Sequence, residues 1–267
     1  MEEIAAKDIP EISISIVSHA QINLVETLLD DIDSCCRLSS IELIVTLNIG
    51  EVLPENVNKF TFPIKVIRNS IPQGFAANHN QAFEQAAGSF FCVMNPDVRL
   101  NDNPFPALLA CLENSSVGVV APIIVDASGT LEDSARRFPS PFTILGKVFA
   151  TRKSRDYEVG DETVFPDWVG GMFMLLPRAQ FKQLGGFDQR YFLYYEDVDL
   201  CARLRLSGYE VALCPHATAI HQARRDSHRK FRYLKWHMAS MVRFFCSMAF
   251  LKISWQRSIR SLRRKAV

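Results

Sequence analysis

Apolar residues follow two different periods along the first part of the chain. The alternation in Ile12–Val17 predicts a first strand, and the apolar residues of Ile22–Cys36 recur at helical spacing. Two more β-rich runs, Glu42–Leu47 and Ile64–Arg68, predict the next strands. Strand, helix and strand in this order favour a parallel α/β sheet of the Rossmann type. Such a sheet binds ligands beyond the carboxyl ends of its strands.

The same patterns continue through the second half of the chain. The predicted helices are Gln73–Ala87, Phe105–Leu112, Arg178–Leu184 and Glu196–Ser207, and the predicted strands are Phe90–Met94, Val117–Val125, Asp167–Leu176 and Tyr209–Cys214. Residues 126–166 are rich in polar residues, Pro and Gly, which predicts a loop-rich insertion over the cleft. No internal repeat or low-complexity tract divides the pattern, so we expect one large α/β domain.

Three carboxylates open the helix predicted at Glu196, and two explanations compete for them. Acidic residues in a first helical turn are stabilised by the helix dipole and the free N–H groups there. Alternatively, one of Glu196, Asp197 and Asp199 is a general base at the mouth of a cleft. Asp199 lies four residues before Arg203, which suits an ion pair on the helix, so we expect a structural role for Asp199.

Asn95-Pro96-Asp97 directly follows the apolar run Phe90–Met94. By itself this tripeptide is typical of a turn with a helix-capping Asp. At the carboxyl end of a central strand, however, a carboxylate can hold a divalent cation against the diphosphate of a ligand. The pattern alone leaves both explanations open.

The net charge of +1 conceals an uneven distribution. Residues 221–267 contain thirteen Lys or Arg and one Asp, whereas the rest of the chain has 17 basic and 28 acidic residues. An acidic body with a basic tail predicts a partner with an anionic surface. The seven cysteines show no C-x-x-C spacing, and residues 1–10 lack the apolar run of a signal peptide. Reduced thiols and a cytoplasmic protein are therefore expected.

Three motifs stand in order along the chain: Asn95-Pro96-Asp97, Gly185-Gly186-Phe187-Asp188 and Tyr195-Glu196-Asp197-Val198-Asp199-Leu200. Together with Gln73–Asn80 and Trp168–Gly171, they resemble the family 2 glycosyltransferases, which are inverting enzymes with the GT-A fold. The resemblance is to the bacterial branch that contains rhamnosyltransferases of polysaccharide assembly. It implies a GT-A α/β domain over residues 1–228, with a basic helical extension over residues 229–267.

The resemblance also implies roles for the carboxylates. Asp97 matches the metal-binding Asp of the family's Asp-x-Asp motif, with Asn95 in place of the first Asp, and would hold Mg²⁺ or Mn²⁺. His221 resembles a family histidine near the metal, although a lone histidine is more often structural. Asp197 matches the proposed base that deprotonates the acceptor hydroxyl, and Glu196 would position that base or the acceptor.

Further residues are expected to contact the two substrates. The expected donor-binding residues are Ser18, Asn48, Gly74, Asn78, Asn95 and Asp97, and the expected acceptor-binding residues are Trp168, Gly171 and Asp188. Asp188 has the alternative role of a plain turn residue. Where the family often has Tyr-Asn after its first strand and Asp-Asn after its second, this chain has His19-Ala20 and Leu47-Asn48. These departures concern the pocket for the base and ribose.

The basic tail is predicted to be helical over Arg229–Trp255. Its most apolar part, Phe244–Leu251, is too short to span a bilayer and is flanked by Arg243 and Lys252. A basic helix with aromatic residues can lie on an anionic leaflet, which predicts peripheral attachment to the cytoplasmic face of the inner membrane. The alternative is that its apolar face packs on the body. Nucleic-acid binding is not expected, since no recognised nucleic-acid motif accompanies the charge.

The expected activity is inverting, metal-dependent transfer of a sugar from a nucleotide sugar to a saccharide or polyprenyl-linked saccharide. By resemblance the leading donor is dTDP-rhamnose, and UDP- or GDP-sugars are the alternative. Two other classes remain open: a nucleotidyltransferase, although residues 18–21 lack a Gly- and Lys-rich loop, and a GT-A-like scaffold without activity. Asp97 and Asp197 are expected to face each other across one cleft.

Overall fold

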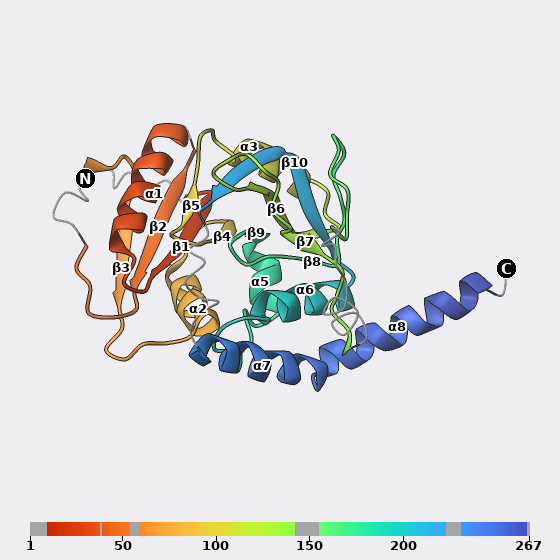
Figure 1. The fold of residues 1–267 in the computed structure, drawn as a ribbon. Coiled ribbons are helices and arrows are strands. Elements are labelled where there is room, and N and C mark those ends of the chain that lie inside the picture. Colours follow the sequence, from red (N-terminus) through yellow and green to blue (C-terminus); the bar gives the residue numbers. More distant parts are fainter. Residues whose placement is uncertain (1–9, 38, 54–58, 142–154, 223–230, 266–267) are drawn as a thin grey trace, which may run out of the picture.

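The centre of the protein is a mixed eight-stranded sheet with helices on both faces (Figure 1). The computed structural model describes residues 10–37, 39–53, 59–141, 155–222 and 231–265. In spatial order the strands are β3 (Ile64–Arg68), β2 (Ile41–Leu47), β1 (Ile12–Ser18), β4 (Phe90–Met94), β9 (Phe173–Pro177), β6 (Val117–Val125), β10 (Glu210–His221) and β5 (Val98–Arg99). Two short strands, β7 (Ala135–Arg136) and β8 (Trp168–Val169), pair separately.

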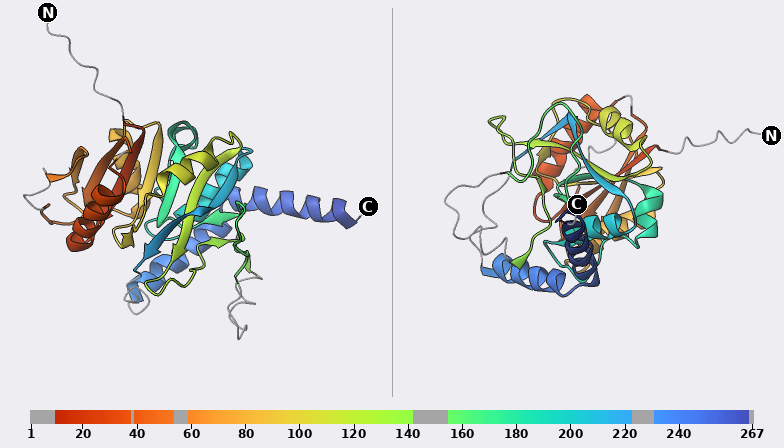
Figure 2. Two further views of the ribbon diagram at one scale, coloured as in Figure 1. Left: turned by 90° about the horizontal axis from the view of Figure 1, so that it is seen from above. Right: turned by 90° about the vertical axis from the view of Figure 1, so that its right-hand side faces the viewer.

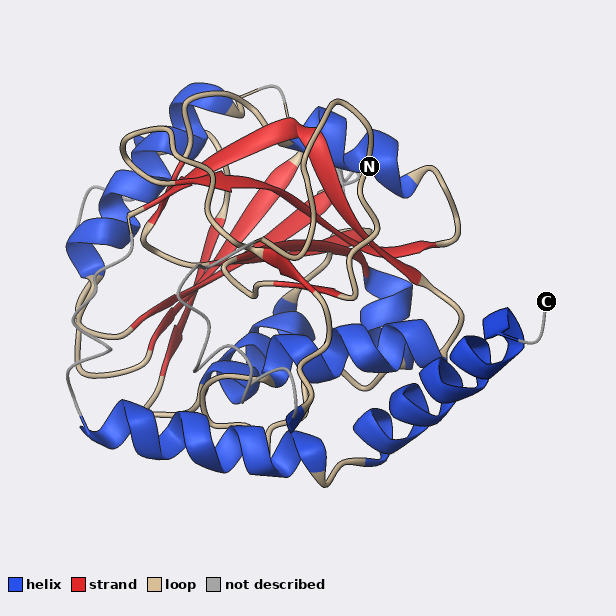
Figure 3. Cartoon of the chain, turned by 45° about the vertical axis from the view of Figure 1, so that its right-hand side comes forward, coloured by secondary structure: helices blue, strands red, loops and turns tan. Residues whose placement is uncertain are grey.

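Two layers of helices cover this sheet (Figure 3). The helices are α1 (Ile22–Cys35), α2 (Phe75–Gln85), α3 (Phe105–Leu112), α5 (Arg178–Gln183), α6 (Glu196–Leu206), α7 (Phe231–Phe245) and α8 (Met248–Lys265). Helices α1 and α3 share one apolar core with the sheet, and α2, α5, α6 and α8 contribute to the core on the opposite face. The predicted strands and helices of the body agree with these bounds within a few residues, apart from the stretch at 167–176 and from β10, which continues to His221 where the strand was predicted to end at Cys214.

Strand β9 makes the sheet mixed rather than parallel. Strands β3, β2, β1 and β4 run parallel, as expected from the Rossmann-like pattern, but β9 lies between β4 and β6 and is antiparallel to both. The single strand predicted over Asp167–Leu176 was wrong. The chain forms β8, turns at Gly171–Met172, and only then enters β9, because the N–H of Gly171 bonds to Asp197 instead of a neighbouring strand.

Strand β1 is buried on both faces, although its alternation is typical of a half-buried strand. Its isoleucines face the core formed with α1 and α3. On the other face Ser13 donates a 2.6 Å hydrogen bond to Glu42, and Ser15 lies 2.7 Å from Nδ1 of His79 in α2. Burial lowers the pKa of His79 to about 3, so this histidine is neutral. The serines are tolerated inside because each has a polar partner.

The basic tail packs on the body along part of its length. Phe244, Ala249 and Ile253 are buried in the core formed with α2, α5 and α6, and the hydroxyl of Ser240 donates to the carbonyl of Leu193. One continuous helix was predicted, but α7 ends at Phe245 and α8 begins at Met248. Helix α8 then extends away from the sheet (Figure 2). The predicted domain boundary at 228/229 lies outside the described residues.

Among the described helices, none combines the length and the apolar character that a membrane-spanning helix requires.

Candidate active site

A cavity of about 680 Å³ opens at the carboxyl ends of β1, β2 and β4. This is the position where open α/β sheets bind their ligands. The lining includes His19, Asn48, Gly74, Asn78, Asn95 and Asp97 on the sheet side, and Phe192, Tyr194, Arg232, Tyr233 and Trp236 on the other side. Five of the six expected donor-binding residues therefore lie together on one wall.

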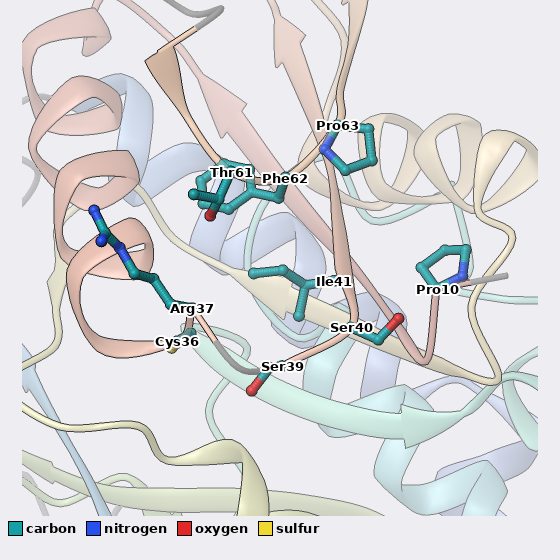
Figure 4. Close-up of a pocket in the computed structure, with 9 residues that line it drawn as sticks. All are labelled: Pro10, Cys36, Arg37, Ser39, Ser40, Ile41, Thr61, Phe62 and Pro63. Carbon is teal, nitrogen blue, oxygen red and sulfur yellow. The ribbon is translucent and has the colours of Figure 1, made fainter. Parts of the chain in front are cut away.

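A smaller cavity of about 220 Å³ lies at the opposite edge, where β1 and β2 begin (Figure 4). The one charged residue in its described lining, Arg37, forms a 3.3 Å ion pair with Asp33, which lies four residues earlier in α1. Because it lacks a carboxylate and lies away from the carboxyl ends of the strands, this cavity offers little for catalysis.

Asn48 and Asn78 shape the wall of the large cavity through their own hydrogen bonds. The side-chain oxygen of Asn48 accepts from the N–H of Gln73 and the amide of Asn69, and its amide donates to the carbonyl of Gln73 and meets His19. The Asn69 amide also donates to Asn78. With both ends of its amide occupied, Asn48 fixes the loop before α2.

Gly74 lets two segments of the cavity wall approach closely. A Cβ atom at this position would lie 2.4 Å from the carbonyl oxygen of Phe192. The same oxygen accepts a 2.9 Å hydrogen bond from the N–H of Phe75, the first residue of α2. The start of α2 is thereby tied to the loop that leads into α6.

Asp97 lies at the end of the cavity next to His221 in β10. Nε2 of His221 is 3.5 Å from one carboxylate oxygen of Asp97, and Nδ1 is 2.9 Å from Glu132. Burial disfavours the charged imidazole, but hydrogen bonds and charges from Asp97 and Glu132 outweigh it and raise the pKa of His221 to about 9. His221 therefore contacts Asp97, and its expected place near a metal stays a prediction.

The residues around Asp97 suit a divalent cation held jointly with a substrate. Oδ1 of Asp97 is buried without a hydrogen-bond partner, so a ligating oxygen remains available. Mg²⁺ is usually bound through one or two carboxylates plus substrate phosphates, rather than by a cage of protein ligands. The described part of the chain has no cluster of three or more His, Cys, Asp or Glu that could hold a metal ion.

Asp197 is held by two backbone N–H groups at the start of α6. Gly171 donates to Oδ2 at 2.9 Å and Val198 donates to Oδ1 at 2.8 Å. Burial raises the pKa of Asp197, while these N–H groups and the charge of Arg136 oppose the increase. Asp197 is therefore more basic than an exposed aspartate, which suits a proton acceptor.

The surroundings of Glu196 differ from those of Asp197. Its side chain is 5 % exposed, and Oε2 is buried without a partner. Burial and the negative charge of Asp197 raise the pKa of Glu196 well above its usual range. Burial therefore favours the protonated form of Glu196 beside a carboxylate that accepts two backbone hydrogen bonds, and two carboxyl groups with different environments are typical of sites for acid–base chemistry.

The turn before β9 connects this carboxylate pair to the cavity. The carbonyl of Met172 accepts a hydrogen bond from the N–H of Asn95, which lines the cavity, and the preceding residue Gly171 bonds to Asp197. Asp197 itself is not part of the cavity lining, so its expected position across one cleft from Asp97 stays a prediction.

The loop before α6 carries backbone strain at this site. Tyr194 and Tyr195 have φ angles of 71° and 68°, a region that costs energy for residues other than glycine. The ring centroids of Tyr194 and Tyr195 lie 5.4 and 5.5 Å, respectively, from the ring centroid of His237 in α7. The packing of α7 thus helps to hold a strained loop, as is frequent at functional sites.

Besides Glu196, Asp197, Gly171 and His221, three more expected site residues lie outside the lining of the large cavity. Ser18 is buried and donates to Glu51 at 2.9 Å, and Asp188 forms an ion pair with Arg190 at 2.6 Å. The indole N–H of Trp168 donates to the carbonyl of residue 137, and the guanidinium of Arg136 lies 5.7 Å from its ring centroid. The structure therefore does not bring Ser18 or Asp188 into the cavity. The structural role expected for Asp199 is confirmed by its 2.6 Å ion pair with Arg203.

A family model described as "Glycosyltransferase like family 2" matches residues 48–240. The chain belongs to glycosyltransferase family 2. It is 28% identical over 246 residues to rhamnosyltransferase WbbL of Escherichia coli K12, covering 86% of this chain and 91% of that protein. It is also 36% identical over 140 residues to the N-acetylglucosaminyl-diphospho-decaprenol L-rhamnosyltransferase of Mycobacterium tuberculosis, covering 48% of this chain and 45% of that protein.

Solved structures confirm the GT-A fold expected for the glycosyltransferase. GalNAc-T7, crystallised with UDP, GalNAc and Mn²⁺, superposes with a TM-score of 0.63 at 15% identity, covering 83% of this chain and 45% of that chain. The mannosyltransferase PcManGT of Pyrobaculum calidifontis, with GDP-Man and Mn²⁺, gives 0.57 at 16% identity, covering 89% of this chain and 65% of that chain.

Sequence reasoning did not predict that α7 contributes to the glycosyltransferase cavity. Arg232, Tyr233 and Trp236 were assigned to a tail that was expected to bind a membrane or pack on the body. The spacing of Tyr233 and Trp236 on one helical face was a usable signal, because aromatic residues facing the body need a surface to contact.

Proposed function

We propose that this glycosyltransferase is inverting and metal-dependent, and that it moves a sugar from a nucleotide sugar to an acceptor hydroxyl. One observation carries the proposal. Asp97, with an unpaired carboxylate oxygen, lies in the large cavity at the strand ends, and the Gly171–Met172 turn joins that cavity to Asp197. This arrangement provides a metal-binding carboxylate and a general base on either side of one turn.

In the proposed reaction Asp197 accepts the proton of the acceptor hydroxyl. The hydroxyl oxygen attacks the anomeric carbon from the face opposite the diphosphate, and the bond from that carbon to the diphosphate oxygen breaks. A single displacement of this kind inverts the anomeric configuration without a covalent intermediate. The N–H groups of Gly171 and Val198 hold the carboxylate in place, and protonated Glu196 can donate a hydrogen bond beside it.

Asp97, with His221 beside it, would hold Mg²⁺ or Mn²⁺ together with the donor's phosphates. The cation, when bound, neutralises charge that develops on the leaving nucleoside diphosphate. The Mn²⁺ present in two structures of the same fold supports this choice of metal.

For the donor we propose dTDP-rhamnose, on the strength of two relatives that are named as rhamnosyltransferases. The alternative is a UDP- or GDP-sugar, since one solved structure contains UDP and GalNAc and the other contains GDP-Man. For the acceptor we propose a saccharide carried on a polyprenyl diphosphate, which the name of the mycobacterial relative supports.

A lipid-linked acceptor fits peripheral attachment to the cytoplasmic face of the inner membrane. Exposed apolar side chains recur on one face of α7 at Phe231, Leu234, Met238 and Val242, and Trp255 of α8 is 69% exposed. Exposed lysines and arginines lie among them. An amphipathic basic surface of this kind is suited to an anionic leaflet.

The test is a panel of nucleotide sugars incubated with Mg²⁺ or Mn²⁺, with release of nucleoside diphosphate measured with and without a polyprenyl-linked acceptor. We expect release from dTDP-rhamnose that increases when the acceptor is added and stops with EDTA. Anomeric NMR of the product checks inversion. Absence of turnover with every donor would contradict the proposal and favour a scaffold that has lost activity.

A further inference from the structure

Helix α7 is fixed against the cavity by contacts along its length. The ring of Trp236 lies 4.7 Å from that of Phe192, centroid to centroid, and Ser240 donates to the carbonyl of Leu193 at 2.9 Å. Phe192 is in turn bonded through its carbonyl to the start of α2. The inner face of α7 is therefore continuous with the wall built around Gly74.

The charges that line the cavity are few. Among the described lining residues, Asp97 is the single carboxylate and Arg232 of α7 is the single Lys or Arg. A nucleoside diphosphate carries several negative charges. At one end of the cavity, His221 and a bound cation would offset the charge of Asp97. Within the described lining, Arg232 is the one Lys or Arg left to meet the phosphates.

Arg232 is available to a ligand. Its guanidinium lies 4.9 Å from the ring centroid of Trp236, and within the described residues no carboxylate pairs with it. Stacking on an indole restricts the side chain while leaving its edge N–H groups free. These N–H groups match phosphate oxygens in a two-point geometry.

We propose that Arg232 binds the phosphates of the nucleotide donor and that Trp236 positions its guanidinium. The helix at the start of the basic tail is then part of the donor site. This inference rests on the proposed nucleotide-sugar donor, and it adds a phosphate-binding residue that lies far from Asp97 in the sequence.

The experiment measures binding of dTDP, UDP and GDP, with Mg²⁺ and without vesicles, by calorimetry. Arg232→Gln is expected to weaken binding of the preferred nucleoside diphosphate by tenfold or more, while Arg232→Lys loses less. The matched control is Lys235→Gln, which removes the same charge from an exposed position of α7 outside the cavity and should leave binding unchanged.

A second comparison separates positioning from folding. Trp236→Ala should weaken nucleotide binding when Arg232 is present. In the Arg232→Gln variant the same change should have little further effect on affinity, because Trp236 acts through the guanidinium. Circular dichroism checks that each variant is folded. Equal affinity of wild type and Arg232→Gln would overturn the inference while leaving the donor class intact. Failure of the wild type to bind any nucleoside diphosphate would overturn both.

Discussion

The backbone N–H of Gly171 donates a 2.9 Å hydrogen bond to Oδ2 of Asp197. The turn between β8 and β9 therefore sets the direction of the carboxylate at the start of α6. Val198 donates to the other oxygen, so each carboxylate oxygen accepts one of these two backbone hydrogen bonds. Each oxygen therefore keeps a lone pair that can accept a proton from a substrate. A base held in this way needs little reorganisation when it receives a proton.

Asp197→Asn removes the proposed base and keeps the size of the side chain. We expect the rate of transfer to fall by roughly 10²–10⁴-fold, the usual contribution of general base catalysis. Donor affinity should change little, because Asp197 lies outside the donor cavity. Single-turnover transfer and calorimetric donor binding check the two parts, and near-normal transfer would exclude Asp197 as the base.

Glu196→Gln imitates the protonated acid that the structure favours. The raised pKa of Glu196 means that the folded state binds this proton more tightly than the unfolded state, so stability falls as pH rises above the usual value near 4.5. Glutamine has no such dependence. We expect the variant to be more stable than wild type at pH 7, by on the order of 1 kcal/mol, and similar to it at pH 4.

Urea unfolding at the two pH values measures this difference. Transfer by Glu196→Gln should be much closer to wild type than transfer by Asp197→Asn. A loss of stability at pH 7 would instead mean that Glu196 is ionised and has a partner.

Asp97→Asn tests the cation site through nucleotide binding. In metal-free buffer the variant should bind the nucleoside diphosphate at least as well as wild type, because a carboxylate that repels phosphate is gone. With Mn²⁺ the wild type should gain about tenfold in affinity, equivalent to ~1.4 kcal/mol, and the variant should gain little. An equal gain from Mn²⁺ in both proteins would place the cation elsewhere.

Gly74→Ala tests the close approach of the two wall segments. A Cβ 2.4 Å from the carbonyl of Phe192 forces the loop away from α2, and overpacking of this kind costs roughly 1–3 kcal/mol. We expect lower stability and weaker nucleotide binding. Gly50→Ala is the control, since nothing lies within 4 Å of its Cβ position. Equal behaviour of the two variants in urea unfolding would contradict this prediction.

Replacement of Leu234, Met238 and Val242 by serine tests the membrane surface without removing buried residues. The three side chains are 46–57% exposed, so the fold should be unaffected. We expect the variant to lose most of its flotation with anionic vesicles, whereas Val52→Ser, at another exposed apolar position, behaves as wild type. Unchanged flotation of the triple variant would remove this face of α7 as the lipid contact.

The sequence predicted several strands well. Ile64–Arg68 and Phe90–Met94 were predicted with the bounds that the structure gives, because runs of β-branched and aromatic residues favour strands whether the strand is partly or fully buried. The place of β9 was not predictable in this way. Periodicity shows that a segment is buried, but it does not show which strands lie beside it, so the antiparallel strand between β4 and β6 was missed.

The candidate site was also predicted where local patterns decide it and missed where contacts distant in sequence decide it. Asn48, Asn78 and Asp97 were expected at one edge because each follows a strand or begins a helix, which is local information. Arg232 was missed because the docking of α7 depends on contacts such as Ser240 with Leu193, which are distant in sequence. Asp188 was placed in the site by its motif, but Arg190, two residues later, occupies its carboxylate.

The position of β9 also constrains the order in which the chain can fold. Strands β3, β2, β1 and β4 come from the first hundred residues and can pair as soon as they are made, but the outer edge of β4 stays open until residues 173–177 arrive. An open, apolar strand edge is a template for aggregation. During synthesis this edge has to be shielded until a strand from much later in the chain closes it.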